Sequence, residues 1–297
     1  MRVAAIGIGS NSLRMLLADV ENDRLIRIER FREGLRVFAA LDSQKRISSE
    51  MIQRACESVR AYCAEAKGRG ATALHLFATS AVRDASNQEE LISALQNASG
   101  LELDICSGEE EACLSFLGAT DGGAAALIDI GGGSTEIALG CGQDISDACS
   151  LQMGAVRLQR NFPIQNCADA WQVVEAAAQI IRPVKERFAN QFDRNWTGVG
   201  GTFTSCAAVV QNISWERRDK IHRFQLTEEA VEEAMVRLSS LTLDERLQLA
   251  CLQPQRADIV VHGIAILLAC MKNLGISSIT VSECGNLEGY LKRKYLF

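Results

Sequence analysis

The sequence lacks the long apolar segments that membrane insertion or secretion would require. Its longest apolar run, from Ile259 to Met271, is too short to span a bilayer and contains His262. The N-terminus shows no signal-peptide pattern, because Arg2 is followed by a strand-like run without a cleavage motif. We therefore expect the protein to be cytoplasmic.

No cysteine motif predicts a disulfide framework. The chain contains 11 cysteines, an odd number, and no pair of them has the C-x-x-C spacing. Cys56 and Cys63 are seven residues apart in an expected helix, where that spacing places both on one face as small apolar core residues. Free thiols in a reducing compartment are therefore expected, in agreement with a cytoplasmic location.

An excess of basic residues is also missing. Lysine and arginine number 31 against 37 aspartates and glutamates, so the net charge is −6. That balance gives no general attraction to nucleic acid or to a membrane surface, although a local basic cleft remains compatible with it. With 47% hydrophobic and 23% charged residues, the 297-residue chain has the composition of a soluble globular protein with room for two domains.

The expected secondary structure repeats along the chain. Apolar periodicity and turn residues predict three strands followed by alternating helices and strands, which cover 3–8, 13–20, 25–31, 48–67, 73–79, 87–97, 101–106 and 107–117. A second block again begins with three strands, over 124–130, 135–139 and 148–153. It continues with a long helix over 168–191, which Pro183 should kink or split, and with further helices and strands.

This repeat predicts the fold class. Asp121-Gly-Gly123 separates the two blocks, so we expect an N-terminal domain over 1–121 and a C-terminal domain over 122–297. Each block opens with three strands and carries a glycine-containing turn after the first of them. The simplest architecture is a duplicated α/β unit, with the two glycine turns facing one another across a cleft between the domains.

The stretch Leu127–Leu139 is the strongest local signal for a binding site. It is an apolar strand that breaks at Gly131, Gly132 and Gly133 and then resumes, and consecutive glycines leave backbone N–H groups open to a phosphate. The neighbouring residues add hydroxyl donors and two carboxylates, which suit a divalent cation beside phosphate. These residues are Ser134, Thr135, Asp129 and Glu136. A glycine-rich hairpin with solvated carboxylates explains the same pattern, but a weaker copy at Ile6–Arg14 favours phosphate binding.

Further motifs follow in order along essentially the whole chain. They are Gly9-Ser-Asn-Ser-Leu-Arg14, Ala78-Thr-Ser-Ala-Val-Arg-Asp-Ala-Ser-Asn87, Ser107-Gly-Glu-Glu-Glu-Ala112, Ile128-Asp-Ile-Gly-Gly-Gly-Ser-Thr-Glu136, Met153-Gly-Ala-Val-Arg157, Gly200-Gly-Thr202, Arg256-Ala-Asp-Ile-Val260 and Val281-Ser-Glu-Cys-Gly-Asn-Leu-Glu-Gly289. The series resembles the exopolyphosphatase/guanosine-pentaphosphate phosphatase (Ppx/GppA) family, in a short two-domain form, within the actin–hexokinase–Hsp70 superfamily. The glycine turns fit any member of that superfamily, whereas the Thr-Ser-Ala-x-Arg and Ser-Gly-x-Glu-Glu-Ala segments narrow the resemblance to this branch.

The resemblance implies duplicated ribonuclease H-like (actin-like ATPase) α/β domains and a catalytic role for two residues. Glu111 matches the glutamate that orients and deprotonates an attacking water, and Arg83 matches an arginine that clamps phosphate. Without the family match, the run Glu109–Glu111 is explained as a solvated acidic helix start, and Arg83 as a surface arginine paired with Asp84.

The ligands that the resemblance implies are magnesium and phosphate. Asp129 and Glu136 match the carboxylates associated with Mg²⁺. The residues implied to donate hydrogen bonds to phosphate oxygens are Ser10, Asn11, Ser12, Gly132, Gly133, Ser134, Thr135, Gly200, Gly201 and Thr202. The basic stretch 217–223 offers a further anion contact, although a solvated charge run explains it better. His75 and His262 are expected at core or edge positions and not in catalysis.

Two departures from the family pattern stand out. Relatives usually carry aspartate where this chain has Gly7, and in the superfamily that carboxylate helps to hold the metal or its water shell. Relatives typically have Gly-Leu-Arg-Glu-Gly where this chain has Gly285-Asn-Leu-Glu-Gly289, so an arginine is absent. Both changes keep open a reduced or altered activity.

The expected activity is release of terminal phosphate from inorganic polyphosphate, or of the 5′-phosphate from guanosine pentaphosphate, by water that Glu111 activates. One alternative is a catalytically impaired phosphate or alarmone sensor, which Gly7 suggests. Another is an actin-like small-molecule kinase, which is disfavoured because the Glu111 motif suits water activation and no nucleotide-base pocket can be located. The sequence itself does not indicate an oligomeric state, although family members commonly dimerise, so the resemblance leaves a homodimer possible.

Overall fold

The fold divides into two compact units. The computed structural model describes residues 1–120, 122–189, 191 and 194–297. Over these residues, unit 1 consists of Met1–Gly118 with Asn286–Phe297, and unit 2 consists of Ala119–Gly285. Asp121 at the predicted domain boundary, and Asn190 near the end of the predicted long helix, lie outside the described residues.

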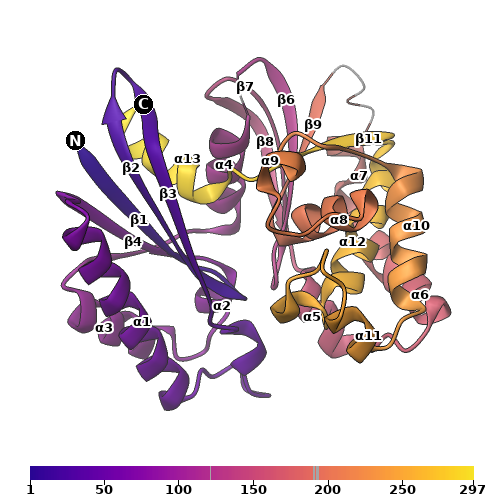
Figure 1. Ribbon diagram of the computed structural model, residues 1–297, viewed down its shortest axis with the longest axis horizontal. Helices are drawn as coiled ribbons and strands as arrows, with labels where there is room; N and C mark the ends of the chain where they lie inside the picture. Colours follow the sequence, from indigo (N-terminus) through magenta and orange to yellow (C-terminus); the bar gives the residue numbers. More distant parts are fainter. Residues whose placement is uncertain (121, 190, 192–193) are drawn as a thin grey trace. The chain divides into compact units, whose positions relative to one another are not determined.

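Unit 1 is built on a mixed sheet (Figure 1). Its strands are β1 (Arg2–Ile8), β2 (Ser12–Glu21), β3 (Arg24–Gly34), β4 (Ala73–Ala78) and β5 (Leu103–Ile105), in the spatial order β3-β2-β1-β4-β5. Strand β1 is antiparallel to β2 and parallel to β4, which is in turn parallel to β5. The carboxyl ends of β1, β4 and β5 therefore meet at the same edge of the sheet.

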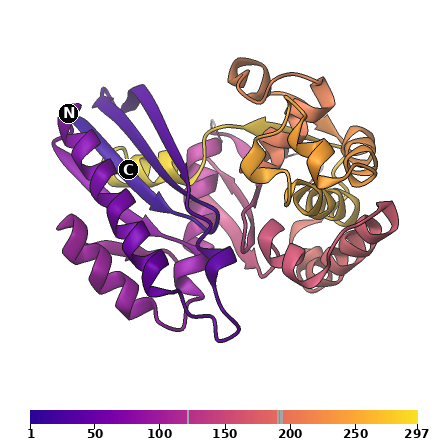
Figure 2. The ribbon, with the colours of Figure 1, turned by 60° about the horizontal axis from the view of Figure 1, so that its bottom comes forward.

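Helices cover both faces of this sheet (Figures 1 and 2). They are α1 (Ser49–Gly68), α2 (Ser80–Arg83), α3 (Gln88–Ser99), α4 (Gly108–Ala119) and α13 (Asn286–Tyr295), with a 3₁₀ turn η1 at Phe38–Ala40. Helix α1 begins where the sequence predicts, because the Ser48 side chain accepts a hydrogen bond from Met51 N. Helix α3 ends at Gly100, whose φ of 70° is the left-handed conformation of a helix C-terminus.

Unit 2 repeats the topology of unit 1. Its strands are β6 (Ala124–Ile130), β7 (Thr135–Cys141), β8 (Asp144–Leu151), β9 (Asn195–Val199), β10 (Gln225–Thr227) and β11 (Ser278–Ser282), in the order β10-β11-β9-β6-β7-β8. Strand β6 is antiparallel to β7 and parallel to β9, as β1 is to β2 and β4. The series β8-β7-β6-β9-β11 is thus the counterpart of β3-β2-β1-β4-β5, and the predicted duplicated α/β fold is confirmed.

In unit 2, the predicted break of the long helix at Pro183 is confirmed, and one predicted strand begins earlier than expected. The helices of this unit are α5 (Ala155–Asn161), α6 (Cys167–Ile181), η2 (Arg182–Val184), α7 (Lys185–Phe188), α8 (Gly201–Gln211), α9 (Arg218–Ile221), α10 (Glu228–Ser239), α11 (Leu243–Leu247), η3 (Pro254–Arg256) and α12 (Val260–Leu274). Pro183 splits the long predicted helix between α6 and α7, as expected. The strand predicted over 148–153 begins earlier, because a turn at Gly142 with a φ of 61° lets β8 pair with β7 from Asp144 onward.

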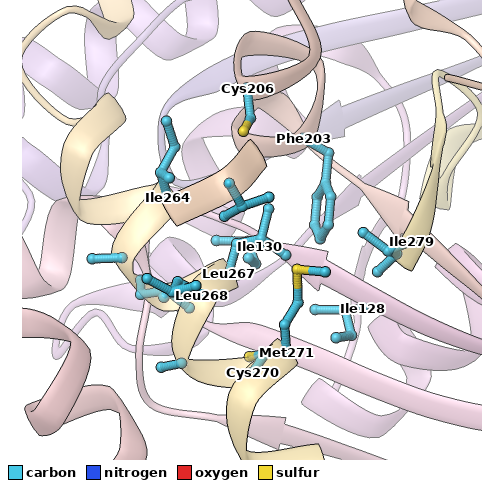
Figure 3. Close-up of a cluster of buried hydrophobic side chains, with 14 of the residues drawn as sticks. Ile128, Ile130, Phe203, Cys206, Ile264, Leu267, Leu268, Cys270, Met271 and Ile279 are labelled. Carbon is cyan, nitrogen blue, oxygen red and sulfur yellow. The ribbon is translucent and has the colours of Figure 1, made fainter. Parts of the chain in front are cut away.

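The core of unit 2 is centred on α12, which is buried along nearly its whole length and packs against α6, α8 and α10. Ile128 and Ile130 of β6, Phe203 of α8 and Met271 of α12 meet there (Figure 3). Because side chains alternate along a strand, Asp129 lies on the face of β6 that is turned away from this core.

The C-terminal helix α13 packs within unit 1, whereas the predicted C-terminal domain over 122–297 included it. Leu287, Tyr290 and Leu291 are buried against the sheet of unit 1, and the Tyr290 ring stacks on Phe77 with 4.6 Å between ring centroids. The prediction followed chain continuity, but an apolar helix face packs wherever a sheet face needs covering.

Two further expectations concern thiols and membranes. All 11 cysteines lie within the described residues and are free thiols, as expected. In the described ranges, no helix combines the length and the apolar character that crossing a membrane needs.

The two histidines expected in the core are both packed against other elements. His75 Nε2 lies 2.7 Å from the Tyr295 hydroxyl, and His262 Nε2 lies 2.9 Å from Phe162 O. Burial lowers the pKa of the His262 imidazole; the Phe162 carbonyl opposes this, Arg246 adds to it and Asp258 opposes it. His262 is therefore neutral in the folded protein at pH 7.

This burial makes stability depend on pH. The folded-state pKa of His262 lies below its ordinary value of 6.5. The stabilisation of the folded state by the neutral imidazole is therefore present above pH 6.5 and is lost as the pH falls through the folded-state pKa. We expect His262→Gln to reduce the drop in melting temperature on acidifying from about pH 7.5 to about 5.5. An unchanged drop in His262→Gln would contradict the assignment.

Candidate functional site

The predicted site residues of unit 1 lie where its parallel strands end. Ser10, Asn11 and Ser12 are in the turn after β1, Arg83 ends the short helix that follows β4, and Glu111 is in the first turn of α4, after β5. Since β1, β4 and β5 are parallel neighbours, these residues gather at the carboxyl edge of the sheet, where α/β proteins usually bind ligands.

Backbone hydrogen bonds fix the turn after β1. Gly9 N donates to Ser12 O at 3.0 Å, and Asn11 O accepts from Arg36 N at 3.0 Å. The side-chain amide of Asn11 is buried, and its Oδ1 has no partner among the described residues. Because an amide can exchange its oxygen and nitrogen by rotation, this position can offer an N–H to an anion.

Two further polar atoms close to this edge are buried without a partner in the described part of the chain. They are Ser80 Oγ and Arg83 Nη2. Ser80 follows Thr79, whose N–H bonds to Ile8 O at the end of β1, so the two turns are adjacent. Buried polar groups normally have partners; donors that lack one at the end of a sheet favour an anionic ligand.

Arg83 and Glu111 form an ion pair at this edge. Arg83 Nη1 donates to Cys106 O at 2.7 Å and lies 3.5 Å from Glu111 Oε2. Glu111 is only 7% exposed. Burial and, next, the Glu111 charge raise the pKa of the Cys106 thiol to about 12, so Cys106 contributes its carbonyl and no thiolate.

The other glutamates of the acidic run have a structural role. Glu109 and Glu110 are exposed. Ser107 N donates to Glu110 Oε2 at 2.7 Å and Ser107 Oγ accepts from Glu110 N, which is a capping box at the start of α4. Glu109 and Glu110 therefore form the solvated acidic helix start that was the alternative explanation of this run. Glu111, in contrast, is turned into the protein.

In unit 2, the glycine turn is held by the first turn of α5. Ala155 N donates to Gly131 O at 3.0 Å, and Val156 N donates to Gly132 O at 2.9 Å. Arg157 Nε donates to Gly133 O at 2.6 Å. The turn carbonyls are thereby directed toward α5, so the N–H groups of the same peptides are directed away from it.

Residues on both sides of the glycine turn pack closely against it. Ser134 and Thr135 are both buried, and Thr135 Oγ1 donates to Met153 O at 2.6 Å. Thr135 therefore ties β7 to the start of α5, which is a different use from the phosphate contact that the resemblance implies. Gly154, the residue before α5, lies so close to the turn that a Cβ would overlap the backbone of Gly132.

Asp129 and Glu136 face each other across the β6–β7 pair. They are 8% and 1% exposed, and Ser150 Oγ donates to Glu136 Oε1 at 2.7 Å. Like charges at directly opposed positions repel, so a cation between them would be stabilising. The described residues contain no group of three or more His, Cys, Asp or Glu suited to a metal. Two carboxylates are nevertheless a donor set that could hold Mg²⁺, which takes one or two carboxylates and completes its shell with water and phosphate.

Gly200 brings the end of β9 close to Asp129. It has a φ of 98°, and a Cβ there would lie 2.9 Å from Asp129 Oδ1 and 2.8 Å from Ile130 O. Both the conformation and the close approach require glycine. Thr202, in the first turn of α8, is buried, and its side chain lies against Gly263 of α12. Of the predicted segment 200–202, Gly200 is therefore the residue that lies beside Asp129.

Arg256 is a site residue that the sequence interpretation left without a role. A Cβ on Gly201 would overlap the Arg256 guanidinium, so this cation lies directly against the start of α8. The sequence signal that could have indicated Arg256 was the motif Arg256–Val260, in which a charged residue stands directly before an apolar helix. The basic stretch 217–223 is largely neutralised, since Arg217 pairs with Asp219 and Arg218 with Glu283.

Comparison with known proteins identifies the family and the fold of this chain. The sequence profile of the Ppx/GppA phosphatase family matches residues 16–296. Exopolyphosphatase 2 from Mycobacterium tuberculosis is 31% identical over an alignment 310 positions long, which covers 97% of this chain and 97% of that protein. The crystal structure of the Aquifex aeolicus Ppx/GppA family member has a TM-score of 0.85 at 25% identity, over 100% of this chain and 98% of that one. An exopolyphosphatase structure from Cytophaga hutchinsonii shares the fold, with a TM-score of 0.88 at 24% identity, over 99% and 98% of the two chains. The chain is a member of the Ppx/GppA phosphatase family.

Proposed function

We propose that the protein is an exopolyphosphatase, which releases the terminal phosphate of inorganic polyphosphate by attack of water. Family membership and the 31% identity to Exopolyphosphatase 2 support a phosphatase of this kind. The observation that carries the proposal is the buried Glu111 carboxylate, held 3.5 Å from Arg83 Nη1 at the carboxyl edge of the unit 1 sheet. A general base next to a phosphate-binding cation is what hydrolysis of a phosphoanhydride needs.

In the proposed reaction, water forms a bond to the terminal phosphorus while the bridging P–O bond breaks. Glu111 accepts the proton of the water, inorganic phosphate is released, and the shortened chain departs with its new terminal oxygen negatively charged. Arg83 stabilises the charge on the equatorial oxygens, because its Nη2 is a buried donor without a partner among the described residues. Its Nη1 is occupied by Cys106 O, which fixes the guanidinium plane.

The groups of unit 2 are proposed to bind phosphate and Mg²⁺. The N–H groups of the glycine turn and the Arg256 guanidinium supply positive charge, while Asp129 and Glu136 would hold the ion. When bound, Mg²⁺ neutralises charge on phosphate oxygens. Ser150 fixes one oxygen of Glu136 by a hydrogen bond, so the carboxylate is oriented before the ion arrives.

The decisive experiment compares substrates. Phosphate release should be measured from long-chain polyphosphate, guanosine pentaphosphate and ATP, with and without Mg²⁺. We expect Mg²⁺-dependent release from polyphosphate well above that from ATP. Release from guanosine pentaphosphate alone would assign the other activity in the family's name, and phosphate transfer from ATP to a small acceptor would indicate a kinase. Binding of these anions without turnover would indicate a sensor.

Glu111→Gln tests the general base. The amide keeps the shape of the side chain but cannot accept the proton, so turnover should fall by roughly 10²–10⁴-fold with little change in polyphosphate affinity. Glu109→Gln, at an exposed position of the same helix turn, is the control and should behave as the original protein. Arg83→Ala should instead raise the half-saturating substrate concentration as well as slow turnover. Near-normal turnover of Glu111→Gln would remove Glu111 from the mechanism.

Gly154→Ala tests the glycine turn. The new Cβ would overlap the backbone of Gly132 and Gly133 and push the turn out of position, although a φ of −139° suits alanine. We expect polyphosphate affinity to weaken roughly ten- to a hundredfold. Gly68→Ala, where a Cβ meets open space, is the matched control. An affinity unchanged in Gly154→Ala, measured on folded protein, would place phosphate elsewhere.

Ser150→Ala tests the carboxylate pair. Loss of the hydrogen bond to Glu136 Oε1 leaves that carboxylate free to rotate, so Mn²⁺ affinity, measured as a probe for Mg²⁺, should fall about tenfold. Ser146→Ala is the control on the same strand, since Ser146 Oγ donates to Leu139 O instead. Equal affinities in the two variants would argue against Glu136 as a ligand.

A further inference from the structure

The β1–β2 hairpin of unit 1 is the duplicate of the β6–β7 hairpin of unit 2. The strands β1 and β6 occupy equivalent places in their sheets, and each leads through a glycine-containing turn to an antiparallel partner. Matching the two turns residue by residue places Gly7 at the position of Asp129, and Arg14 at the position of Glu136. Both pairs are directly opposed across their strands.

The duplicated positions differ in charge. The hairpin of unit 2 presents two buried carboxylates, Asp129 and Glu136. The hairpin of unit 1 presents an arginine, Arg14, and no side chain at Gly7. A divalent cation is therefore attracted to one hairpin and repelled by its duplicate.

The space in front of Gly7 is filled by apolar side chains. A Cβ at this position would lie 2.9 Å from Phe77 Cζ and 3.3 Å from Leu287 Cδ2. The Phe77 ring is 1% exposed and stacked on Tyr290, so it cannot move aside without disturbing the core. Gly7 does not have a positive φ. Crowding by Phe77, and not backbone strain, is therefore what requires glycine here.

Arg14, the cross-strand neighbour of Gly7, has an incomplete set of hydrogen bonds among the described residues. Its Nη2 donates to Asn286 Oδ1 at 3.0 Å, while its Nε is buried without a partner within the residues described. A carboxylate at Gly7 would be the direct cross-strand partner of this guanidinium. Leu287 stands where relatives typically carry arginine, and it lies beside Gly7, where relatives usually carry aspartate. The two departures from the family pattern therefore occur at adjoining positions, which are apolar in this chain.

We propose that the duplicated hairpins have divided their roles: the β6–β7 hairpin binds the divalent cation, and the β1–β2 hairpin binds none. Position 7 belongs to the contact with Phe77 and Leu287, and its glycine is not a lost metal ligand. The inference deepens the proposed function, since the cation is the one assigned there to Asp129 and Glu136. It also gives a different explanation of Gly7 from the alternative in which the missing carboxylate impairs the enzyme.

The test measures Mn²⁺ binding by electron paramagnetic resonance, and thermal melting, on the full chain. We expect a single site in the original protein, which Asp129→Asn weakens at least tenfold. Gly7→Asp should leave Mn²⁺ affinity unchanged within twofold while it lowers the melting temperature. Gly7→Ala adds the crowding without the charge, so it should melt between Gly7→Asp and the original protein. Adding Leu287→Arg to Gly7→Asp should recover part of the lost melting temperature.

Two results would overturn the proposal. One is tighter Mn²⁺ binding in Gly7→Asp than in the original protein. The other is a Mn²⁺ site that survives in the double variant Asp129→Asn with Glu136→Gln, which can be measured even if Gly7→Asp does not fold. Neither measurement requires turnover, so an original protein that failed to hydrolyse polyphosphate would defeat the proposed function and leave this inference to be judged on metal binding and melting alone.

Discussion

The candidate site of unit 2 depends on the hydrogen bonds between the start of α5 and the glycine turn. The first N–H groups of a helix have no partner within it, and here Ala155 and Val156 give theirs to the carbonyls of Gly131 and Gly132. This exchange fixes the peptide planes on both sides. It satisfies the helix start without a capping side chain, and it leaves the opposite side of each turn peptide, with its N–H, for an anion. Gly154 must be small for the two backbones to approach this closely.

The two units apply the same sheet topology to different chemistry. In unit 1, the strand ends carry a base and an arginine, Glu111 and Arg83, with buried donors that lack protein partners in the described residues. In unit 2, the equivalent edge carries opposed carboxylates and a helix start covered by Arg256. The two hairpins supply equivalent positions, and the residues found there, such as Gly7 and Asp129, differ in the charge that they carry.

Much of the fold and part of the site followed from local patterns. Alternating apolar residues and glycine turns predict β1, β2, β6 and β7, and Pro183 predicts the split between α6 and α7, because these signals act within a few residues. The contact between Gly201 and Arg256 could not be predicted, since it joins segments far apart in the chain. The same holds for Gly7 and Leu287: each departure from the family pattern was visible in the sequence, but their proximity was not. The roles of Glu111 and Arg83 rest on the family motif, which the residue types alone would not have distinguished from an acidic helix start.

Unit 1 is discontinuous, because its last helix, α13, is made from the final residues of the chain. During synthesis, the strands β1 to β5 therefore emerge from the ribosome without the helix that covers Phe77 and its neighbours. Unit 2 is continuous and lies between the two segments of unit 1 in the sequence. Unit 1 can therefore complete its core only after the whole of unit 2 has been synthesised. Damage to α13 would then act on the N-terminal half of the protein, because it would uncover the apolar face formed by Phe77 and its neighbours.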